Sequence, residues 1–269
     1  MKEIITLNCY TLQQFPQLTD YEQVAELLRQ DIMASANILA ASFIGSYTTV
    51  HHSRLSGLDI ALAYKGSVTM LPKSLARSLR VARERNVQVN ILPITSSDKV
   101  DRRGPIDPAS LAAIERFEGY GGAIKGCLSD YCFSNGQAES VVLSYISGTL
   151  NELVNEYLDY KNLPLEQRSQ ALTRTLYGVI YAARLICFAA GFGAQQSFGT
   201  NKAELVRIFS QRSSRWCTHW LETLVSFDQE YDKIIDRDSV DPTMYSNLRK
   251  KIQEAMPGSI EFLQRNLAV

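Results

Sequence analysis

The chain has 269 residues, 28 acidic and 28 basic side chains, and 45% hydrophobic residues. A chain of this size can bury one large core or two smaller ones. Its zero formal charge gives no reason to expect nucleic acid as a partner. No stretch has the apolar length of a membrane span, and the amino-terminal segment lacks the features of a signal peptide. The five cysteines follow no zinc-binding spacing, so we expect reduced thiols and a cytoplasmic protein.

The first half of the chain mixes strand-like and helix-like patterns. In chain order we expect a strand at 4–7, a helix over 20–40, strands ending at 43–44 and spanning 58–63, a helix over 72–86, a strand over 87–94, a loop over 95–109 and a turn at 119–122. Short strands separated by helices favour one small mixed sheet with helices packed on it.

The second half of the chain has only helical patterns. The expected helices span residues 141–157, 166–190, 201–211, 216–231 and 242–267. Thr200 is the expected N-cap of the third of these helices, and Gly191 has the position of a C-cap glycine after the second. We therefore predict an α+β fold, with a small mixed-sheet domain over residues 1–135 and a helical bundle over residues 136–269.

The segment that joins the first two core strands holds the candidate site. Gly45 permits a tight turn, and Ser46 with its neighbouring N–H groups could form an anion-binding concavity. Asp59 is the one carboxylate within the apolar strand that follows. An unpaired carboxylate in an apolar strand is costly. Asp59 therefore either holds a metal ion that bridges to phosphate, or pairs with an arginine such as Arg54 or Arg184.

Two motifs carry a resemblance to a known family. Ile44, Gly45 and Ser46 match an hGS motif, and residues 56–62 align without a gap on the S-D-h-D-h-x-h motif that follows about ten residues later. This pattern resembles the signature of nucleotidyltransferases of the DNA polymerase β superfamily, with aminoglycoside adenylyltransferases as the nearest likeness. The resemblance implies a nucleotidyltransferase-like domain at the amino-terminal end.

The helical half is also similar to that family. Its members carry an arginine in the long apolar helix and a lysine at the start of the next one, and Arg184 and Lys202 occupy these positions. The resemblance implies that Gly45, Ser46, Arg184 and Lys202 hold a nucleoside triphosphate, most simply ATP, in a cleft between the domains. Taken on their own residue contexts, Ser46 could instead cap a turn, Arg184 could pair with a buried acid, and Lys202 could be solvated.

The resemblance further implies transfer of a nucleoside monophosphate to a hydroxyl of an acceptor, with Mg²⁺ held by two motif aspartates and a later carboxylate. Gly57 and Gln88 stand at two of these three positions, so Asp59 is the one carboxylate left. A single Mg²⁺ could still be held by Asp59 together with the triphosphate. His51 and His52 could replace the lost carboxylate as general base or acid, or could be ordinary loop residues.

Two functions remain open from the sequence. The first is a nucleotidyltransferase with a rearranged site that acts on a small-molecule acceptor. The second is a catalytically degenerate or repurposed relative that binds a ligand as a regulatory protein. In both cases we expect a nucleotide as partner and a monomer or homodimer, without a role for membranes.

Overall fold

The computed structural model describes residues 16–268 except 50–51, 53–55, 67–70, 97–102, 160–164, 193–196, 199–200, 213–218 and 236–241. The strand expected at 4–7, and also His51 and Arg54, lie outside the described residues. Described residues up to Gln137 form one compact unit, and those from Ala138 onward form another. None of the described helices combines the length and the apolar character that crossing a bilayer requires.

The first unit is built on a small mixed sheet, which confirms the α+β class. Its strands lie in the order β3-β2-β1-β5, and β1 is antiparallel to β2 and to β5, whereas β2 and β3 are parallel. A separate pair of parallel strands, β4 and β6, completes the unit. The strands are β1 (Ile38–Ile44), β2 (Leu58–Lys65), β3 (Val89–Ser96), β4 (Gly104–Ile106), β5 (Ala123–Lys125) and β6 (Cys132–Ser134).

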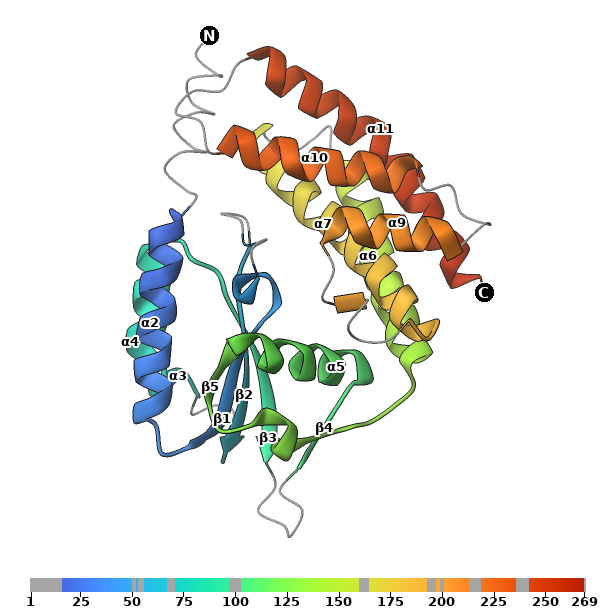
Figure 1. The fold of residues 1–269 in the computed structure, drawn as a ribbon. Coiled ribbons are helices and arrows are strands. Elements are labelled where there is room, and N and C mark those ends of the chain that lie inside the picture. Colours follow the sequence, from blue (N-terminus) through green and yellow to red (C-terminus); the bar gives the residue numbers. More distant parts are fainter. Residues whose placement is uncertain are drawn as a thin grey trace. The chain divides into compact units, whose positions relative to one another are not determined.

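Helices cover both faces of the four-stranded sheet. On one face lie α2 (Leu18–Ala34) and α4 (Ala76–Glu84), and on the other lies α5 (Pro108–Phe117), as Figure 1 shows. The buried residues divide between the two faces by strand alternation. Leu58, Ile60 and Leu62 belong to the core under α2 and α4, and the intervening Ala61 and Ala63 belong to the core under α5. Asp59 has the same alternation as Ala61, which places it on the α5 face.

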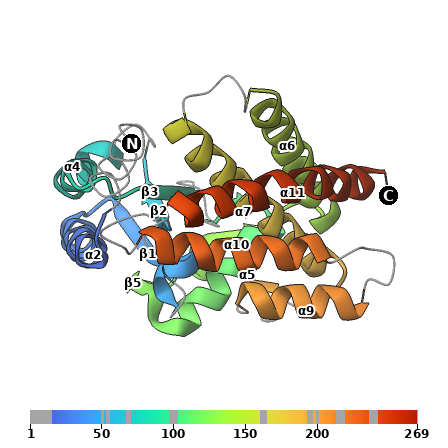
Figure 2. The same cartoon turned by 90° about the horizontal axis from the view of Figure 1, so that it is seen from above.

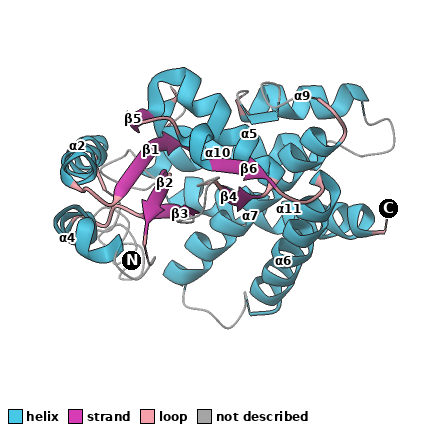
Figure 3. Cartoon of the chain, turned by 90° about the horizontal axis from the view of Figure 1, so that it is seen from below, coloured by secondary structure: helices cyan, strands magenta, loops and turns pink. Residues whose placement is uncertain are grey.

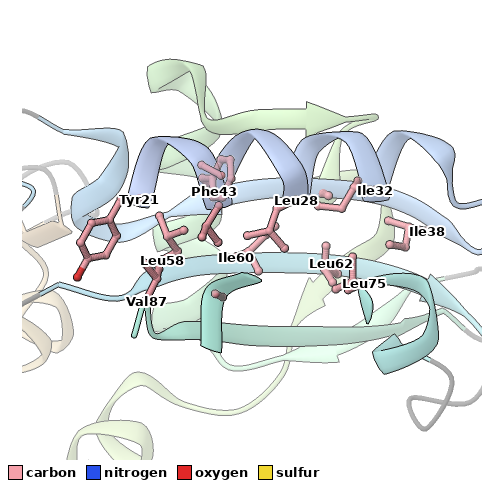
Figure 4. Packing of buried hydrophobic residues seen from close by; sticks show 14 of the residues in the cluster. Tyr21, Leu28, Ile32, Ile38, Phe43, Leu58, Ile60, Leu62, Leu75 and Val87 are labelled. Atoms are coloured by element: carbon pink, nitrogen blue, oxygen red, sulfur yellow. The ribbon is translucent and has the colours of Figure 1, made fainter. Parts of the chain in front are cut away.

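The core between α2 and the sheet is apolar and closely packed. Figure 4 shows Leu28 and Ile32 of α2 lying over the strand residues Ile60 and Leu62. All four side chains are completely buried. Burying a Leu or Ile side chain contributes roughly 1.5–3 kcal/mol, so this layer holds β1 and β2 in place beneath the candidate site.

Two of the expected helix boundaries are wrong. The helix expected over 20–40 ends at Ala34, because Ser35 adopts extended backbone angles (φ −80°, ψ 119°), and Ile38 and Leu39 begin β1 instead. The end of the helix was not predicted, because apolar residues recur at helical spacing on both sides of Ser35. The helix expected over 72–86 is divided into α3 (Leu71–Ser74) and α4, since Leu75 between them has non-helical angles (φ −114°, ψ 16°).

The loop expected over 95–109 is also partly wrong. It contains β4, and α5 begins inside it at Pro108. Asp107 caps this helix, because its side chain accepts a hydrogen bond of 2.9 Å from the N–H of Ser110, and Pro108 takes the first helical turn, where its missing N–H costs nothing. The turn expected at 119–122 is η3 (Glu118–Gly122), a π-type turn in which Gly121 has a φ of +80°.

The second unit consists of helices in its described residues, as expected (Figure 3). Within this unit α6 packs against α7 and α11, and α10 lies along α11 (Figure 2). The helices are α6 (Ala138–Asp159), α7 (Leu165–Ala189), α9 (Lys202–Arg212), α10 (His219–Ile235) and α11 (Pro242–Leu267).

The cap of α9 differs from the expected one. Asn201 accepts a hydrogen bond of 2.8 Å through its Oδ1 from the N–H of Glu204, which is the geometry of a helix N-cap. Thr200, the expected cap, lies outside the described residues. Gly191 follows α7 with a φ of +81°, which fits its expected place at the end of that helix.

Candidate functional site

The predicted turn brings the backbone of Gly45 against the carboxylate of Asp59. Strand β1 runs into η1 (Gly45–Thr48), a turn of 3₁₀ helix, and Gly45 has a φ of +79°. In the antiparallel pairing Ile44 lies opposite Asp59. A Cβ atom on residue 45 would lie 2.5 Å from Oδ2 of Asp59. Glycine is therefore required here twice, for the backbone angle and for the space that the carboxylate fills.

The turn itself is held by threonines rather than by Ser46. The Thr48 hydroxyl donates to the carbonyl of Gly45 at 2.9 Å, and the Thr49 hydroxyl and N–H donate to the carbonyl of Ser46 at 2.9 and 3.0 Å. The Ser46 hydroxyl forms no hydrogen bond with any residue that the structure describes. Ser46 is partly buried beside the turn, and its hydroxyl stays available to a ligand.

A chain of two carboxamides ends on Asp59. The parallel register of β2 and β3 places Asn90 beside Asp59. Asn90 donates through Nδ2 to Oδ1 of Asp59 at 2.7 Å, and Gln88 donates through Nε2 to Oδ1 of Asn90 at 3.0 Å. An ionised carboxylate can only accept, so Asp59 fixes the orientation of both amides.

Sequence reasoning missed Asn90. The resemblance pointed to Gln88 as the third carboxylate position, but the strand register makes Asn90 the direct neighbour of Asp59. Gln88 and Asn90 lie two residues apart and share one face of β3, and this alternation was the available signal. Both candidates for a further carboxylate are therefore neutral amides.

Gly57, which the resemblance aligns with the first motif aspartate, has little space for a side chain. A Cβ atom on Gly57 would lie 2.8 Å from Nδ2 of Asn90 and 3.4 Å from the carbonyl oxygen of Gln88. The amide that binds Asp59 thus occupies the space in which a side chain at position 57 would begin. A side chain at position 57 would require the Asn90 amide to shift from its present place.

The environment of Asp59 disfavours its charged form. Burial raises the pKa of Asp59 above its ordinary value, and the hydrogen bond from Asn90 opposes this shift without cancelling it. No arginine in the described part of this unit forms an ion pair with Asp59, while Arg54 lies outside the described residues and Arg184 belongs to the other unit, so pairing with either of them stays a prediction. The described residues contain no group of three or more His, Cys, Asp or Glu side chains placed to bind a metal.

His52 lies in an aromatic cluster. Its ring meets Tyr21 edge-on with centroids 4.5 Å apart, and Tyr47 edge-on at 5.3 Å. Burial lowers the pKa of His52 below its ordinary value of 6.5, which favours the neutral ring at pH 7. Neither ring nitrogen has a hydrogen-bond partner among the described residues.

The other two predicted ligand residues belong to the helical unit. Arg184 is partly buried on α7 between the buried Ala183 and Leu185, and burial lowers the pKa of its guanidinium. Lys202 is the first residue of α9, is partly buried, and holds its Nζ 4.1 Å from the centre of the Tyr177 ring. Both cationic side chains are therefore partly buried within the helical unit.

Comparison with known proteins adds no relative. No family model matches the chain, and the comparisons with curated proteins and with solved structures found no match. The likeness to nucleotidyltransferases thus depends on the residues at the motif positions, and the fold itself stands as a mixed α+β unit followed by helices.

Proposed function

We propose that the α/β unit binds a nucleoside triphosphate with one Mg²⁺ at the edge formed by η1 and Asp59, and that the chain is a ligand-binding or regulatory protein. The observation that carries this proposal is the hydrogen bond from the Asn90 amide to Asp59. It puts a neutral donor where a two-metal site would need a second carboxylate.

Ligand binding is supported by the residues around the turn. Gly45 lets the backbone approach the Asp59 carboxylate closely, and the Ser46 hydroxyl beside it is available to accept or donate a hydrogen bond. Mg²⁺ is commonly bound by one or two carboxylates together with substrate phosphates. Oδ2 of Asp59 faces Gly45 and not Asn90, so one oxygen of the carboxylate remains for a cation.

Nucleotidyl transfer is disfavoured by the same residues. In a two-metal site, two ions roughly 4 Å apart stabilise the attacking and the leaving oxygens, and several carboxylates offset the charge of the ions. Here one carboxylate and two neutral amides occupy the edge. A carboxamide does not take up a proton near pH 7, so Gln88 and Asn90 supply no general base.

A second candidate is transfer to a small hydroxyl acceptor through a rearranged site. The residue that this candidate would use is His52, whose pKa burial lowers; its ring nitrogens are buried beside Tyr21 and Tyr47 and would have to become accessible to a substrate. A neutral imidazole can act as a general base. Release of pyrophosphate from ATP by wild type, abolished in both Asp59→Ala and His52→Ala, would support this candidate over simple binding.

Calorimetric titration of ATP and GTP, with and without Mg²⁺, tests the proposal on the full chain. We expect binding that needs Mg²⁺ and that weakens at least about tenfold in Asp59→Ala, because this variant loses the carboxylate that would hold the ion. Asp130→Ala is the matched control, because Asp130 is an exposed carboxylate of the same unit. Binding that is indifferent to Mg²⁺ and to Asp59, or no binding at all, would contradict the proposal.

Only the resemblance implies that Arg184 and Lys202 also bind the triphosphate. Both residues belong to the helical unit, whereas Asp59 belongs to the α/β unit. The same titration tests it with Lys202→Ala, against Lys250→Ala, which removes an exposed lysine of that unit. Weaker binding in the first variant only would assign Lys202 to the ligand. Equal affinities would remove Lys202 from the site.

A further inference from the structure

The α/β unit contains a hollow that the proposed triphosphate site does not use. It has a volume of about 450 Å³ and lies between α2, η1 and η3. A volume of this size suits a small-molecule ligand. Neither Asp59 nor Asn90 is among its described lining residues. The side chains that matter below are Glu22, Arg29, Phe43, Tyr47, His52 and Tyr120.

Aromatic rings form much of the wall. Tyr47 packs against Phe43 with ring centroids 4.9 Å apart and receives the edge of His52 at 5.3 Å. Tyr120 is 49% exposed, and the guanidinium carbon of Arg116 lies 3.6 Å from the centre of its ring. Arg116 thus holds the Tyr120 ring in place, and the exposed part of the ring surface can pack against a flat ligand.

The hollow also contains an arginine without a carboxylate partner. Arg29 is partly buried, and its guanidinium carbon lies 5.1 Å from the centre of the Phe43 ring. It forms no ion pair and no hydrogen bond with any side chain or backbone group of the described residues. A guanidinium offers five N–H donors in a fork that matches a carboxylate, so its donors are available to a bound acid.

The described lining carries one cation, Arg29, and one anion, Glu22, so a ligand with several negative charges does not suit it. Glu22 lines the hollow two helical turns before Arg29, roughly 10 Å away along the axis of α2 at 1.5 Å per residue. One cation and one anion do not suit a triphosphate. His52 contributes its ring to the wall, while both of its ring nitrogens are buried and lack a partner among the described residues.

We propose that this hollow binds a small aromatic carboxylic acid. Its ring packs against Tyr47, His52 and Tyr120, and its carboxylate accepts hydrogen bonds from Arg29. This site shares no residue with the proposed triphosphate site. The two are neighbours, since Tyr47 and Thr48 belong to the same turn as Gly45 and Ser46.

Titration of the full chain with benzoate and indole-3-carboxylate, followed by protein NMR, tests this proposal. The neutral amides of the two acids are the matched ligands. We expect the acids to bind at least about tenfold more tightly than their amides, because only the acids form a charged hydrogen-bond pair with Arg29. No binding at millimolar concentration, or equal affinity for acid and amide, would overturn the proposal.

Two variants locate the binding. Arg29→Gln removes the cation, and Arg77→Gln, which removes an exposed arginine of α4, is its control. Tyr120→Ala removes an exposed ring of the wall, and its control is Phe133→Ala, since Phe133 is a similarly exposed ring outside the hollow. We expect weaker acid binding in the first member of each pair only. Tyr120→Ala decides the matter if Arg29→Gln fails to fold, because Tyr120 contributes little to the core.

The two proposals fail independently. Asp59→Ala is expected to weaken ATP and to leave the affinity for the aromatic acids unchanged, while Tyr120→Ala is expected to do the reverse. Loss of acid binding in Asp59→Ala, or acid binding that is unaffected by Tyr120→Ala and Arg29→Gln, would show that the acids do not occupy this hollow.

Discussion

At the scale of single residues, the contact between Asn90 and Asp59 sets this edge apart from a two-metal site. A carboxylate held by an amide at 2.7 Å is oriented and partly shielded, but it has no second carboxylate to share a cation with. The cost of keeping Asp59 at this place appears in its raised pKa. Costly polar groups of this kind are found more often at binding sites than elsewhere.

Asp59→Asn is predicted to stabilise the fold near neutral pH. Burial holds the pKa of Asp59 above its ordinary value of 3.8, so the charged form costs free energy in the folded state. This cost is absent at low pH and develops as the pH rises from 3.8 through the folded pKa. Asn keeps the oxygen that accepts from Asn90. Urea unfolding in Mg²⁺-free buffer should therefore show a gain for the variant near pH 7 that disappears in acid.

A wild type that is more stable than Asp59→Asn at pH 7 would contradict this reading of the carboxylate. It would mean that the charged form of Asp59 gains more from its surroundings than it loses by burial.

Gly45→Ala and Gly121→Ala distinguish the need for a left-handed backbone angle from the need for space beside Asp59. Their φ angles are +79° and +80°, but only at Gly45 would the new methyl group meet another atom, Oδ2 of Asp59 at 2.5 Å. Left-handed backbone costs an alanine roughly 1–2 kcal/mol, and the collision adds to this at position 45. We expect losses of about 1 kcal/mol for Gly121→Ala and about 2–4 kcal/mol for Gly45→Ala in urea unfolding.

Equal losses in the two variants would mean that the Asp59 carboxylate does not lie against Gly45. In an Asp59→Ala background the excess loss at Gly45 should shrink, because the group that the methyl would meet is gone.

Asn90→Asp is predicted to create a metal-dependent fold. Two carboxylates would face each other where an amide now donates, so without metal the variant should lose roughly 1–3 kcal/mol near neutral pH. Mg²⁺ should restore part of this loss by binding both carboxylates. Thermal unfolding with and without Mg²⁺ measures the effect, and Asn90→Ala, which adds no charge, should not respond. A variant that is indifferent to Mg²⁺ would contradict the placement of Asn90 beside Asp59.

At the scale of elements, α5 covers the face of the sheet from which Asp59 projects, and its start depends on one side chain. Asp107 accepts a hydrogen bond from the N–H of Ser110 at 2.9 Å. Asp107→Ala should therefore cost about 1 kcal/mol of stability in urea unfolding, as the loss of an N-cap usually does. Asp130→Ala is the control, an exposed carboxylate of the same unit outside any helix cap. Equal effects of both variants would argue against the cap.

The elements around the site could be predicted where local pattern decides them. The apolar run of β2 and the Gly45 turn are local features, and both lie where the sequence placed them. The pairing of Asn90 with Asp59 depends on the register of two parallel strands, which no short motif determines. The end of α2 was missed for a related reason, because Ile38 fits the helical spacing of the preceding residues although it begins a strand.

At the scale of the whole molecule, the change from mixed elements to helices near residue 137 could be predicted from composition and period alone. Each unit has its own buried residues, among them Leu62 and Phe43 in the first and Ile146 and Leu205 in the second. Which ligand the chain binds cannot be predicted in this way, because the side chains at positions such as 57 and 88 set the chemistry at the edge without determining the fold.

The most direct measurement is the NMR response of the full chain to ATP with Mg²⁺, observed at the side-chain amide of Asn90 and the backbone amides of Gly45 and Ser46. The Asn90 signal is assigned by its loss in Asn90→Asp. We predict that these signals shift on addition of ATP with Mg²⁺, shift less with ATP alone, and do not shift in Asp59→Ala. Signals that stay in place while ATP binds elsewhere, or that never respond, would contradict the assignment of a triphosphate site to Asp59.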